Sequence, residues 1–450
     1  MNNINQLADV CVSDDLSLNA LQEIINRLGP LAASQSCCFH HACGNENVTL
    51  KIIQLLYNTF PGALLLRDDD GWLPIHRLCS NKDLDDANSL EILRFMLSID
   101  PTLPRKTDGD DYLPIHHAVC YKSAAFCKEL IDAYPESLRM ELDDGLPIHR
   151  ACRYGTRDDT ADTIQYMLEL DPELINAQND GGWLPINHAA WQENTKAIEL
   201  LLKFDPDAAS KEVNDESRRL SLHVACNYNT NLSSIQVLYD AYPEAIDISD
   251  EDGDTPLDTA QEEGNQQAIE FLQTQLVYAR QAQDMTAMTT VDENGWLPLH
   301  RALNNNASLG SIKLLVKGNP AALQVADRWG AYSLHIGCKF SSAKVVKYLV
   351  QCNQVILNHV DANKDSPLHY ACRGGSLSVL KYLLEANVPS VSERNNGSKL
   401  AIHLLLECGE NTLDRESMEY VETVWQLLLA NPEVVRDFMQ LSSDHVLYSG

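Results

Sequence analysis

The chain has few basic residues, no long apolar run and no even number of cysteines. Each of these features argues against a class of protein. Its 34 Lys and Arg residues stand against 64 Asp and Glu, which gives a formal net charge of -30. A chain this acidic is not attracted as a whole to nucleic acid or to an anionic membrane surface. We therefore expect no nucleic-acid partner, and a protein partner that is neutral or basic.

Membrane and secretory signals are also missing from the sequence. No window approaches the roughly 18 uncharged apolar residues that a membrane-spanning helix needs. The N-terminus has no basic region followed by an apolar stretch, and thirteen cysteines do not pair completely into a disulfide framework. We expect a protein without membrane insertion in a reducing compartment, the cytoplasm, with the nucleus as an alternative.

The composition is nevertheless that of a folded protein. Of the 450 residues, 44% are hydrophobic, 22% charged and 7% aromatic, which fits neither a disordered nor a collagen-like chain. This length exceeds what one hydrophobic core usually serves. The sequence therefore encodes either several domains or one extended array of repeats.

One short motif recurs along the chain. LPIH occurs at 73–76, 113–116 and 146–149, LPIN at 184–187 and LPLH at 297–300, and weaker copies such as TPLD at 255–258 fill the intervals. The fourth residue marks each copy and recurs every 33 to 42 residues, a period typical of helix-turn-helix repeats. The eleven markers are His40, His76, His116, His149, Asn187, His223, Asp258, His300, His335, His369 and His403.

Local signals around the marker predict two helices in each unit. Proline at the second motif position, as in Pro74, belongs in the first turn of a helix. A second stretch then carries apolar residues at helical spacing, as in 345–350, and a proline phrase such as YPEAI at 242–246 ends it. Acidic, glycine-containing segments such as DDDG at 68–71 predict tight turns between units.

In these features the chain resembles ankyrin-repeat proteins, whose unit has a D-x-x-G turn, T-P-L-H, a short helix and a second helix with V-x-x-L-L. SPLHYACRGGSLSVLKYLLEAN at 366–387 matches that pattern almost position for position. The LPIHxAC wording further resembles large arrays of diatoms and related algae. The resemblance implies an all-α solenoid of about eleven repeats linked by short, finger-like turns.

The chain departs from the family pattern at identifiable positions. Leucine replaces the helix-capping threonine in the five strongest motifs, so we expect buried leucine side chains to offset the lost cap. A longer second helix, at about 265–283, should precede an irregular hinge at 284–292. We divide the chain into an N-terminal capping segment (1–35), a first array (36–283), an irregular linker or finger (284–295), a second array (296–432) and a C-terminal cap or tail (433–450).

Clusters of cysteine and histidine invite a metal-binding hypothesis, notably 37–43 and 116–120. Neither cluster has a standard zinc spacing. Cysteine instead recurs three residues after the marker, as at Cys79 and Cys152, where it replaces a small buried residue of the family pattern. We expect no metal, no cofactor and no catalytic cysteine.

Aromatic and charged side chains near the finger turns are the candidate binding residues. The aromatic rings either pack on the next finger or contact a partner, and the acids are either turn formers or attract a basic partner. Arginines near the marker should by default pair with acids of adjacent units. The candidates are Trp72, Tyr112, Trp183, Trp191, Trp296, Asp69, Asp70, Asp110, Asp111, Arg77, Arg150, Arg153, Arg301 and Arg373.

Residues 301–385 differ from the rest in charge. They contain ten basic and four acidic residues, against the strong negative charge elsewhere. Many of the lysines should lie on second helices, away from the fingers. The asymmetry suggests a second, acidic partner there or head-to-tail self-association, and a solvated face is the alternative.

The sequence thus predicts a non-enzymatic scaffold or adaptor that binds proteins through its fingers and concave face. One alternative is a regulatory or substrate-recruiting part of an enzyme, such as a ubiquitin ligase or a kinase. The other is a metal-binding protein built on the Cys/His clusters.

Overall fold

The computed structural model describes residues 2–28, 37–155, 157–228, 231–386, 389–407 and 417–430. The chain divides into two compact units: unit 1 comprises residues 1–241 and 249–265, and unit 2 comprises 242–248 and 266–450. Across the described ranges the regular structure is helical, apart from two isolated bridges, Leu142 with Gly145 and Ala326 with Tyr332. This confirms the predicted all-α fold.

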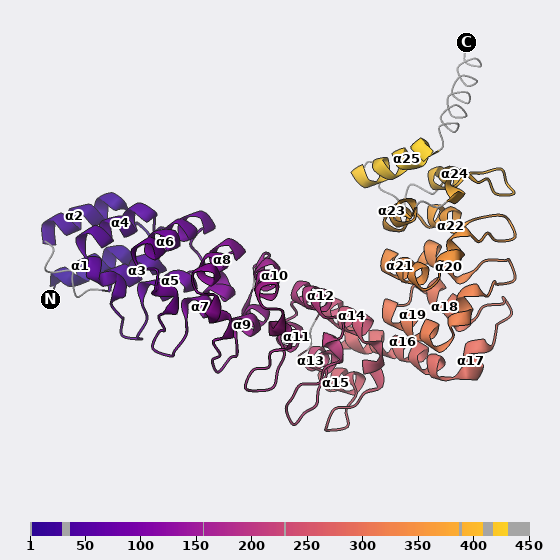
Figure 1. Cartoon of the computed structure of the whole chain (residues 1–450), viewed down its shortest axis with the longest axis horizontal. Coiled ribbons are helices and arrows are strands. Elements are labelled where there is room, and N and C mark those ends of the chain that lie inside the picture. Colours follow the sequence, from indigo (N-terminus) through magenta and orange to yellow (C-terminus); the bar gives the residue numbers. More distant parts are fainter. Residues whose placement is uncertain are drawn as a thin grey trace, which may run out of the picture. The chain divides into compact units, whose positions relative to one another are not determined.

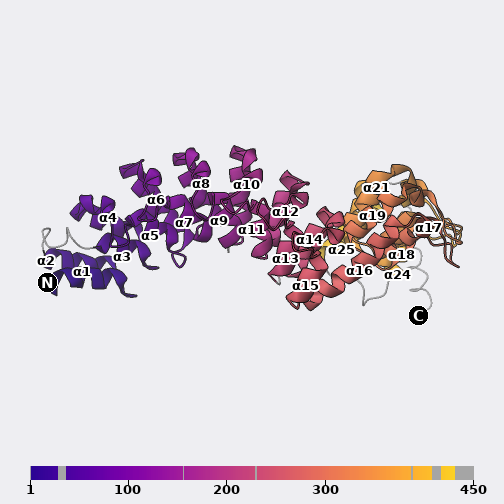
Figure 2. The ribbon, with the colours of Figure 1, turned by 90° about the horizontal axis from the view of Figure 1, so that it is seen from below.

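Unit 1 is a stack of helix pairs in which each first helix is followed by a second helix, except that α15 is followed by α16 of unit 2 (Figure 1). The first helices lie next to one another in a row, and the second helices form a separate row (Figure 2). Its α-helices are α1 Asn2–Val12, α2 Leu18–Leu28, α3 Cys38–Gly44, α4 Leu50–Thr59, α5 Pro74–Ser80, α6 Asp86–Ile99, α7 Pro114–Tyr121, α8 Ala124–Ala133, α9 Pro147–Tyr154, α10 Thr160–Leu170, α11 Pro185–Trp191, α12 Thr195–Phe204, α13 Ser221–Asn227, α14 Leu232–Ala241 and α15 Pro256–Glu262.

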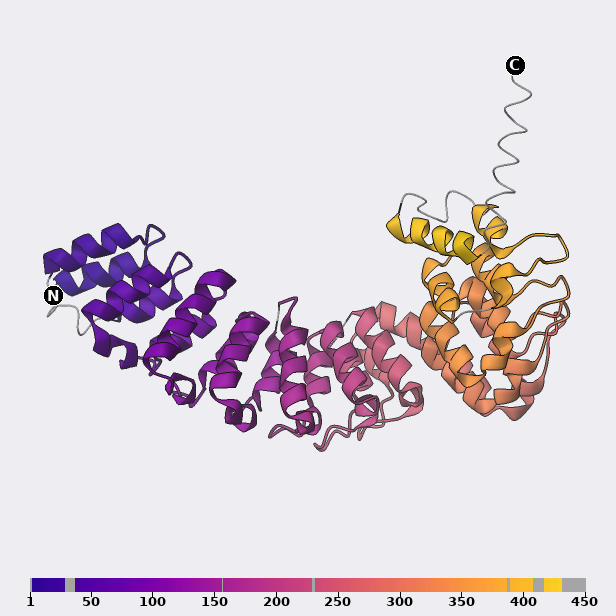
Figure 3. The same ribbon diagram turned by 45° about the horizontal axis from the view of Figure 1, so that its top comes forward.

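Unit 2 repeats the arrangement, and its finger turns project from one side of the stack (Figure 3). Its α-helices are α16 Gln266–Gln283, α17 Met285–Thr289, α18 Pro298–Asn304, α19 Leu309–Gly318, α20 Ser333–Phe340, α21 Ala343–Cys352, α22 Pro367–Gly374, α23 Leu377–Glu385, α24 Ala401–Glu407 and α25 Met418–Ala430. None of the helices in the described ranges is both long and apolar enough to cross a bilayer.

The recurring prolines act at both ends of the helix pair, as predicted. Pro74 occupies the first turn of α5, where its missing N–H leaves no hydrogen bond unmade. Most second helices are followed by short 3₁₀ turns, several of which begin at the proline of the second phrase. These turns are Pro61–Leu65, Leu103–Arg105, Pro135–Arg139, Pro172–Asn176, Ala208–Ser210, Pro243–Asp247, Pro320–Gln324, Gln354–Asn358 and Pro389–Ser392.

The marker histidine makes a backbone hydrogen bond at the start of the first helix in units with and without a polar cap. Leu73 has no side-chain oxygen, but Nδ1 of His76 accepts a hydrogen bond from the backbone N–H of Leu73 at 3.0 Å. The backbone N–H of His76 donates to the carbonyl of Leu73 at 2.9 Å. Leu73 itself is buried. The expected exchange of a polar cap for buried apolar area is therefore confirmed.

The same histidines connect consecutive units. Because Nδ1 is an acceptor, the proton of the neutral ring lies on Nε2, which donates to a backbone carbonyl near the next finger. Burial lowers the pKa of four of these imidazoles, those of His76, His116, His149 and His335, to about 4. The Nε2 links run from His40 to Trp72, His76 to Lys106, His116 to Met140, His149 to Ala177, His300 to Val325, His335 to Asp365 and His369 to Lys399.

The two units whose marker is not histidine keep the same local bond. Oδ1 of Asn187 accepts from the N–H of Leu184 at 2.9 Å. Oδ2 of Asp258 accepts from the N–H of Thr255 at 3.0 Å. The requirement at this position is thus a side-chain acceptor that reaches back three residues.

The structure differs from the sequence interpretation at the N-terminus. The segment 1–35 was expected only to cap the array, but α1 and α2 form a complete helix pair. Leu7 and Cys11 of α1, like Leu21 of α2, are fully buried, so this pair stacks on the next unit as the others do. Residues 29–36 and the predicted tail at 433–450 lie outside the described residues.

The middle of the chain also differs from expectation. The long second helix is confirmed as α16, but the division between the units falls near 241–266 rather than at 284–295. The segment 284–292 is not irregular throughout, because α17 forms there and the fully buried Met288 anchors it to unit 2. Asp284 caps α17 by accepting from the N–H groups of Thr286 and Ala287.

Candidate functional site

Most finger turns are built on one carboxylate or amide side chain at the base, whereas the fingers before Leu146 and Leu220 close through backbone bonds of Leu142 and Val213. In the first finger, Oδ1 of Asp68 accepts from the backbone N–H groups of Asp70 and Trp72 at 3.2 and 2.9 Å. The N–H of Asp68 donates to the carbonyl of Trp72, which closes the turn. Asp108, Asn179, Asp250, Asp292, Asp327, Asp361 and Asn395 do the same in later fingers.

Neighbouring fingers within a unit are in close contact. A Cβ added to Gly71 would lie 2.7 Å from Cα of Gly109 in the next finger, so no side chain fits there. Further along unit 1, the N–H of Asn214 donates to the carbonyl of Gly182. The fingers therefore form a continuous backbone surface, above which side chains project.

A side chain nine residues after the finger base pairs with it. Arg77 donates to Asp68 at 2.7 Å, His117 Nε2 lies 2.8 Å from Oδ2 of Asp108, and the Tyr370 hydroxyl donates to Asp361 at 3.0 Å. Burial by itself would raise the pKa of Asp68, but hydrogen bonds from Arg77 and the Trp72 N–H hold it below the usual value.

At the amide finger base Asn179 the partner is also neutral, whereas the amide of Asn395 donates to the carboxylate of Asp365 at 2.7 Å. Asn179 Nδ2 lies 3.2 Å from Nε2 of His188, which again is nine residues further on. Burial lowers the pKa of His188 to about 3. Charged and neutral pairs alike hold the finger against its own first helix.

The arginine pairing differs from the prediction in one respect. Pairing between adjacent units was expected, but Arg77, Arg301 and Arg373 pair with acids of their own finger. The reason is geometric: each finger folds back onto the helix that it precedes, so the nearest carboxylate belongs to the same unit. Arg219 with Asp250, at 3.0 Å, is a pair that does connect neighbours.

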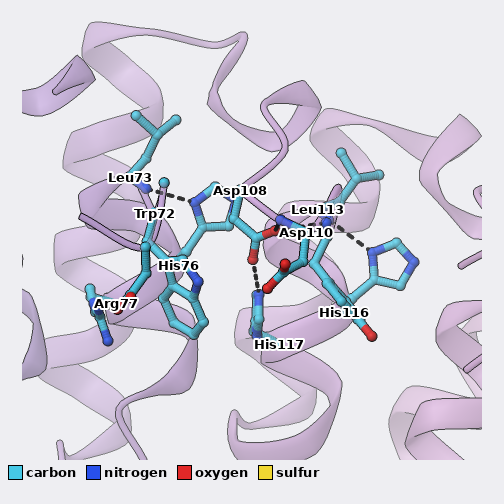
Figure 4. A network of polar contacts seen from close by, with 12 residues as sticks. Trp72, Leu73, His76, Arg77, Asp108, Asp110, Leu113, His116 and His117 are labelled. Atoms are coloured by element: carbon cyan, nitrogen blue, oxygen red, sulfur yellow. Dashed lines mark hydrogen bonds and ion pairs between the residues drawn. The ribbon is translucent and has the colours of Figure 1, made fainter. Parts of the chain in front are cut away.

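The predicted aromatic residues of unit 1 begin a strip of stacked rings and guanidinium groups (Figure 4). The Arg77 guanidinium lies 4.5 Å from the centre of the Trp72 ring, and the His117 ring lies 4.5 Å from the same centre on the next helix. His117 in turn is 5.5 Å from Tyr112. The Arg150 guanidinium covers Tyr112 at 4.8 Å.

The strip continues over the next three first helices. Arg150 and Arg153 lie 5.3 and 4.7 Å from the ring of Tyr154. Arg153 also covers Trp191 at 4.1 Å. Trp191 contacts the rings of Trp183 and Tyr228, with centres 5.6 and 5.2 Å apart.

We name this set the aromatic strip; it is defined by Trp72, Arg77, Tyr112, His117, Arg150, Arg153, Tyr154, Trp183, Trp191 and Tyr228. Its predicted rings are half-buried against neighbouring units, so each has a packing role as well as an outward face. Tyr228, at the end of the strip, is 44% exposed. Contacts of a guanidinium over a ring hold both groups in place while leaving part of each accessible.

The predicted acids lie at the tips of the fingers beside the strip. Asp69, Asp70, Asp110 and Asp111 are exposed, and Asp70 also reaches Arg77 at 2.9 Å. Asp111 has a φ of 66°, the left-handed conformation that glycine supplies in the equivalent position of the first finger. Turn formation and surface charge therefore coincide in these residues.

The remaining predicted residues lie in unit 2 and are not part of the strip. Trp296 donates from Nε1 to Oδ2 of Asp327 in the next finger at 3.0 Å. Arg301 lies 3.8 Å from Asp292, and Arg373 lies 2.7 Å from the buried carboxylate of Asp365. Each of these contacts fixes a finger.

The basic segment of unit 2 lies where the sequence placed it. Lys313 on α19, Lys347 on α21 and Lys381 on α23 follow equivalent buried residues and so occupy corresponding positions on three successive second helices. Lys317 binds Glu244 at 2.5 Å.

The motif cysteines are part of the core. Cys43, Cys79, Cys152, Cys226 and Cys338 are fully buried, and burial raises the pKa of these thiols. They are protonated at neutral pH and pack as small apolar groups. Over the part of the chain that the structure describes, His, Cys, Asp and Glu side chains form no group suited to hold a metal ion.

Sequence reasoning missed three members of the strip, His117, Tyr154 and Tyr228. A signal was present for each of them. His117 follows the marker directly, as Arg77 does, and Tyr154 and Tyr228 both lie five residues after their markers, at the end of the first helix.

The family model for ankyrin repeats matches three overlapping or adjacent stretches, residues 115–215, 222–324 and 299–395, which together cover more than half of the chain. The chain therefore belongs to the ankyrin-repeat family, and its fold is an all-α ankyrin solenoid. Ankyrin repeats are a protein-interaction module.

Two curated relatives are similar over part of their length. Inversin of Canis lupus familiaris is 24% identical over 171 residues, which is 37% of this chain and 15% of inversin. The probable 26S proteasome regulatory subunit p28 of Saccharomyces cerevisiae is 27% identical over 136 residues, 30% of this chain and 56% of p28. The matched part is thus less than two thirds of either relative.

Proposed function

We propose that the protein is a non-enzymatic adaptor whose unit 1 binds a protein segment along the aromatic strip. The observation that carries this proposal is the unbroken sequence of ring and guanidinium contacts from Arg77 to Tyr228, across five successive first helices. Binding sites are typically enriched in Trp, Tyr and Arg side chains that are already held in place.

The charges around the strip favour a basic partner. The arginines of the strip are balanced by finger carboxylates, as in the pairs of Arg77 with Asp68 and Arg150 with Asp144. The acids at the tips, such as Asp69 and Asp110, add exposed negative charge beside the strip. Such a field attracts a basic segment, and lysine or arginine side chains can stack on the outward faces of the rings.

A selection from a library of displayed random peptides tests this proposal. The target is the full chain, and each selected peptide is titrated against the wild type and against a Trp191→Ala, Tyr228→Ala double variant. Phe204→Ala is the matched control, because Phe204 is 41% exposed and lies on α12, a second helix, in the same unit.

We expect the selected peptides to be rich in Lys and Arg and to lose at least tenfold in affinity on the double variant. The control variant should bind them as the wild type does. Acidic or purely apolar sequences, or equal affinity for the double variant, would contradict a basic partner on the strip.

A narrower alternative is that the chain is a regulatory or recruiting subunit of an enzyme. The relative that is a probable proteasome regulatory subunit supports this alternative. Native gel electrophoresis of a cell lysate tests it. A proteasome or ligase activity that comigrates with the wild type, and no longer comigrates with the Trp191→Ala, Tyr228→Ala variant, would show that the adaptor belongs to an enzyme assembly.

A further inference from the structure

The last helix of the described part of unit 2, α25, carries apolar side chains on two opposite faces. Its inner face belongs to the core of unit 2, with Tyr420, Thr423 and Leu427 buried. The other face exposes four large apolar residues: Met418 (74% exposed), Val421 (53%), Trp425 (61%) and Leu429 (63%).

These four residues form a stripe along the helix. Their spacings of three, four and four residues place them within about a quarter of the helix circumference. The exposed Glu419, Glu422 and Gln426 lie along one edge of the stripe. The stripe therefore has an apolar centre and an acidic margin.

Second helices inside unit 2 have no comparable face. On α21 the apolar residues Val345, Val346 and Leu349 are buried against neighbouring helices, and the exposed positions include Lys344 and Lys347. Each internal second helix contacts a second helix on both sides, whereas within the described residues α25 contacts one second helix, α23. Trp425 lies between the buried Thr423 and Leu427 as the exposed Lys381 lies between Val379 and Leu383 on α23, so the stripe occupies the outer positions that carry lysine on internal second helices.

We propose that the stripe on α25 is a docking site for a basic amphipathic helix of a partner protein. A helix fits because the apolar residues of the stripe recur at spacings of three and four residues, the spacing at which two helices pack side by side. The apolar side chains would pack on Trp425 and Leu429, and basic residues at the edge would pair with Glu419 and Glu422. Patches of this kind, on the order of a few hundred Å², are often binding sites on otherwise polar surfaces.

A second copy of the chain fits the stripe less well. Two copies each carry a net charge of -30, and pairing α25 with α25 would bring four glutamates together. The outer face of α2 is a poor apolar counterpart, because beside Leu18 its exposed positions include Asn19, Gln22, Glu23 and Asn26.

The test uses a fluorescein-labelled 18-residue peptide of leucine and lysine, with leucines at helical spacing, titrated by fluorescence anisotropy. A peptide of the same composition without that spacing controls for charge alone, and a leucine–glutamate helix controls for apolar contact alone. The protein is the full chain, as wild type, Trp425→Ser with Leu429→Ser, and Val421→Ser. Trp329→Ser is the matched control, since Trp329 is 45% exposed on a finger of unit 2.

We expect the leucine–lysine helix to bind the wild type and the Trp329→Ser variant at least tenfold more tightly than it binds the double variant, with Val421→Ser in between. The melting temperature should not change, because the altered side chains are exposed. Equal binding by all variants, or equal binding of the peptide without helical spacing, would overturn the proposal. Sedimentation velocity could also overturn it. That would be the result if the wild type were a dimer, the double variant were a monomer, and the peptide did not dissociate the wild-type dimer.

Discussion

The marker histidines make the stability of the array depend on pH, and His149 provides the clearest test. Its Nδ1 accepts from the N–H of Leu146, and its Nε2 donates to the carbonyl of Ala177, both at 3.0 Å. A proton on Nδ1 would remove the first bond. Burial accordingly lowers the pKa of this imidazole from 6.5 to about 4.

The magnitude follows from that difference. Above pH 6.5 the ring is neutral in both the folded and the unfolded chain, and its contribution to stability is complete. As the pH falls from 6.5 toward 4, the unfolded chain takes up a proton that the folded chain excludes. The contribution is therefore lost in this range, by about 2 kcal/mol at pH 5 and about 3 kcal/mol in all.

His149→Asn is the decisive variant, because the chain itself uses asparagine at this position. Asn187 keeps the backbone bond at 2.9 Å without a titrating group. We expect the free energy of unfolding of His149→Asn, from urea titrations followed by circular dichroism, to fall about 2 kcal/mol less than that of the wild type between pH 7 and pH 5. His149→Ala should be less stable at both pH values, since it leaves the N–H of Leu146 unpaired.

The choice of pH separates this effect from that of the finger carboxylates. Hydrogen bonds hold the pKa of acids such as Asp68 and Asp292 below 3.8, so their contribution is lost only at lower pH. An equal loss of stability in the wild type and in His149→Asn between pH 7 and pH 5 would refute the assigned role of the neutral imidazole.

Three further predictions concern fingers, caps and thiols. Asp111→Gly should raise the melting temperature and add up to about 1 kcal/mol to the free energy of unfolding, because glycine tolerates the φ of 66° at this position. Gly71→Ala should lower the melting temperature, since the added Cβ would meet Gly109. Urea titration should show that Ser366→Ala lowers the free energy of unfolding by about 1 kcal/mol, because it removes a side-chain cap. Leu113→Ala should lower it by about 2–5 kcal/mol, because it opens a cavity. Equal losses would contradict the idea that a buried leucine offsets the missing polar cap. In the native protein a thiol reagent should modify the exposed Cys352 much faster than the buried Cys152, as peptide mapping of the labelled chain would show.

Much of the fold could be predicted from the sequence because its signals are local and repeated. The motif, its proline and the spacing of apolar residues identified eleven helix pairs and the long helix α16 correctly. The N-terminal pair was recognised only in part, since α1 has no marker motif and is defined by burial of Leu7 and Cys11. The helix α17 was missed because a single buried side chain, that of Met288, anchors it.

The sequence predicted most of the residues that belong to the candidate site, but not which of their side chains contact one another. Trp72, Tyr112 and Trp191 were identified from their positions in the motif, yet their contacts cross from one unit to the next. Which ring meets which guanidinium depends on the offset between stacked helices, and that offset is a tertiary property. The direction of arginine pairing was wrong for the same reason, because the return of each finger onto its own helix is not visible in the spacing.

The measurement that tests the central claim most directly is site-specific photocrosslinking in a lysate of the cells that make the protein. A benzophenone amino acid replaces Tyr228 at the end of the aromatic strip or, as a control, Glu169, which is exposed on the second helix α10. We predict that the benzophenone at position 228 yields a discrete crosslinked protein and that the benzophenone at position 169 yields none. An added Lys- and Arg-rich peptide should reduce the crosslink at position 228. Crosslinks of equal yield at both positions, or at 169 alone, would contradict the account of the strip as the binding surface.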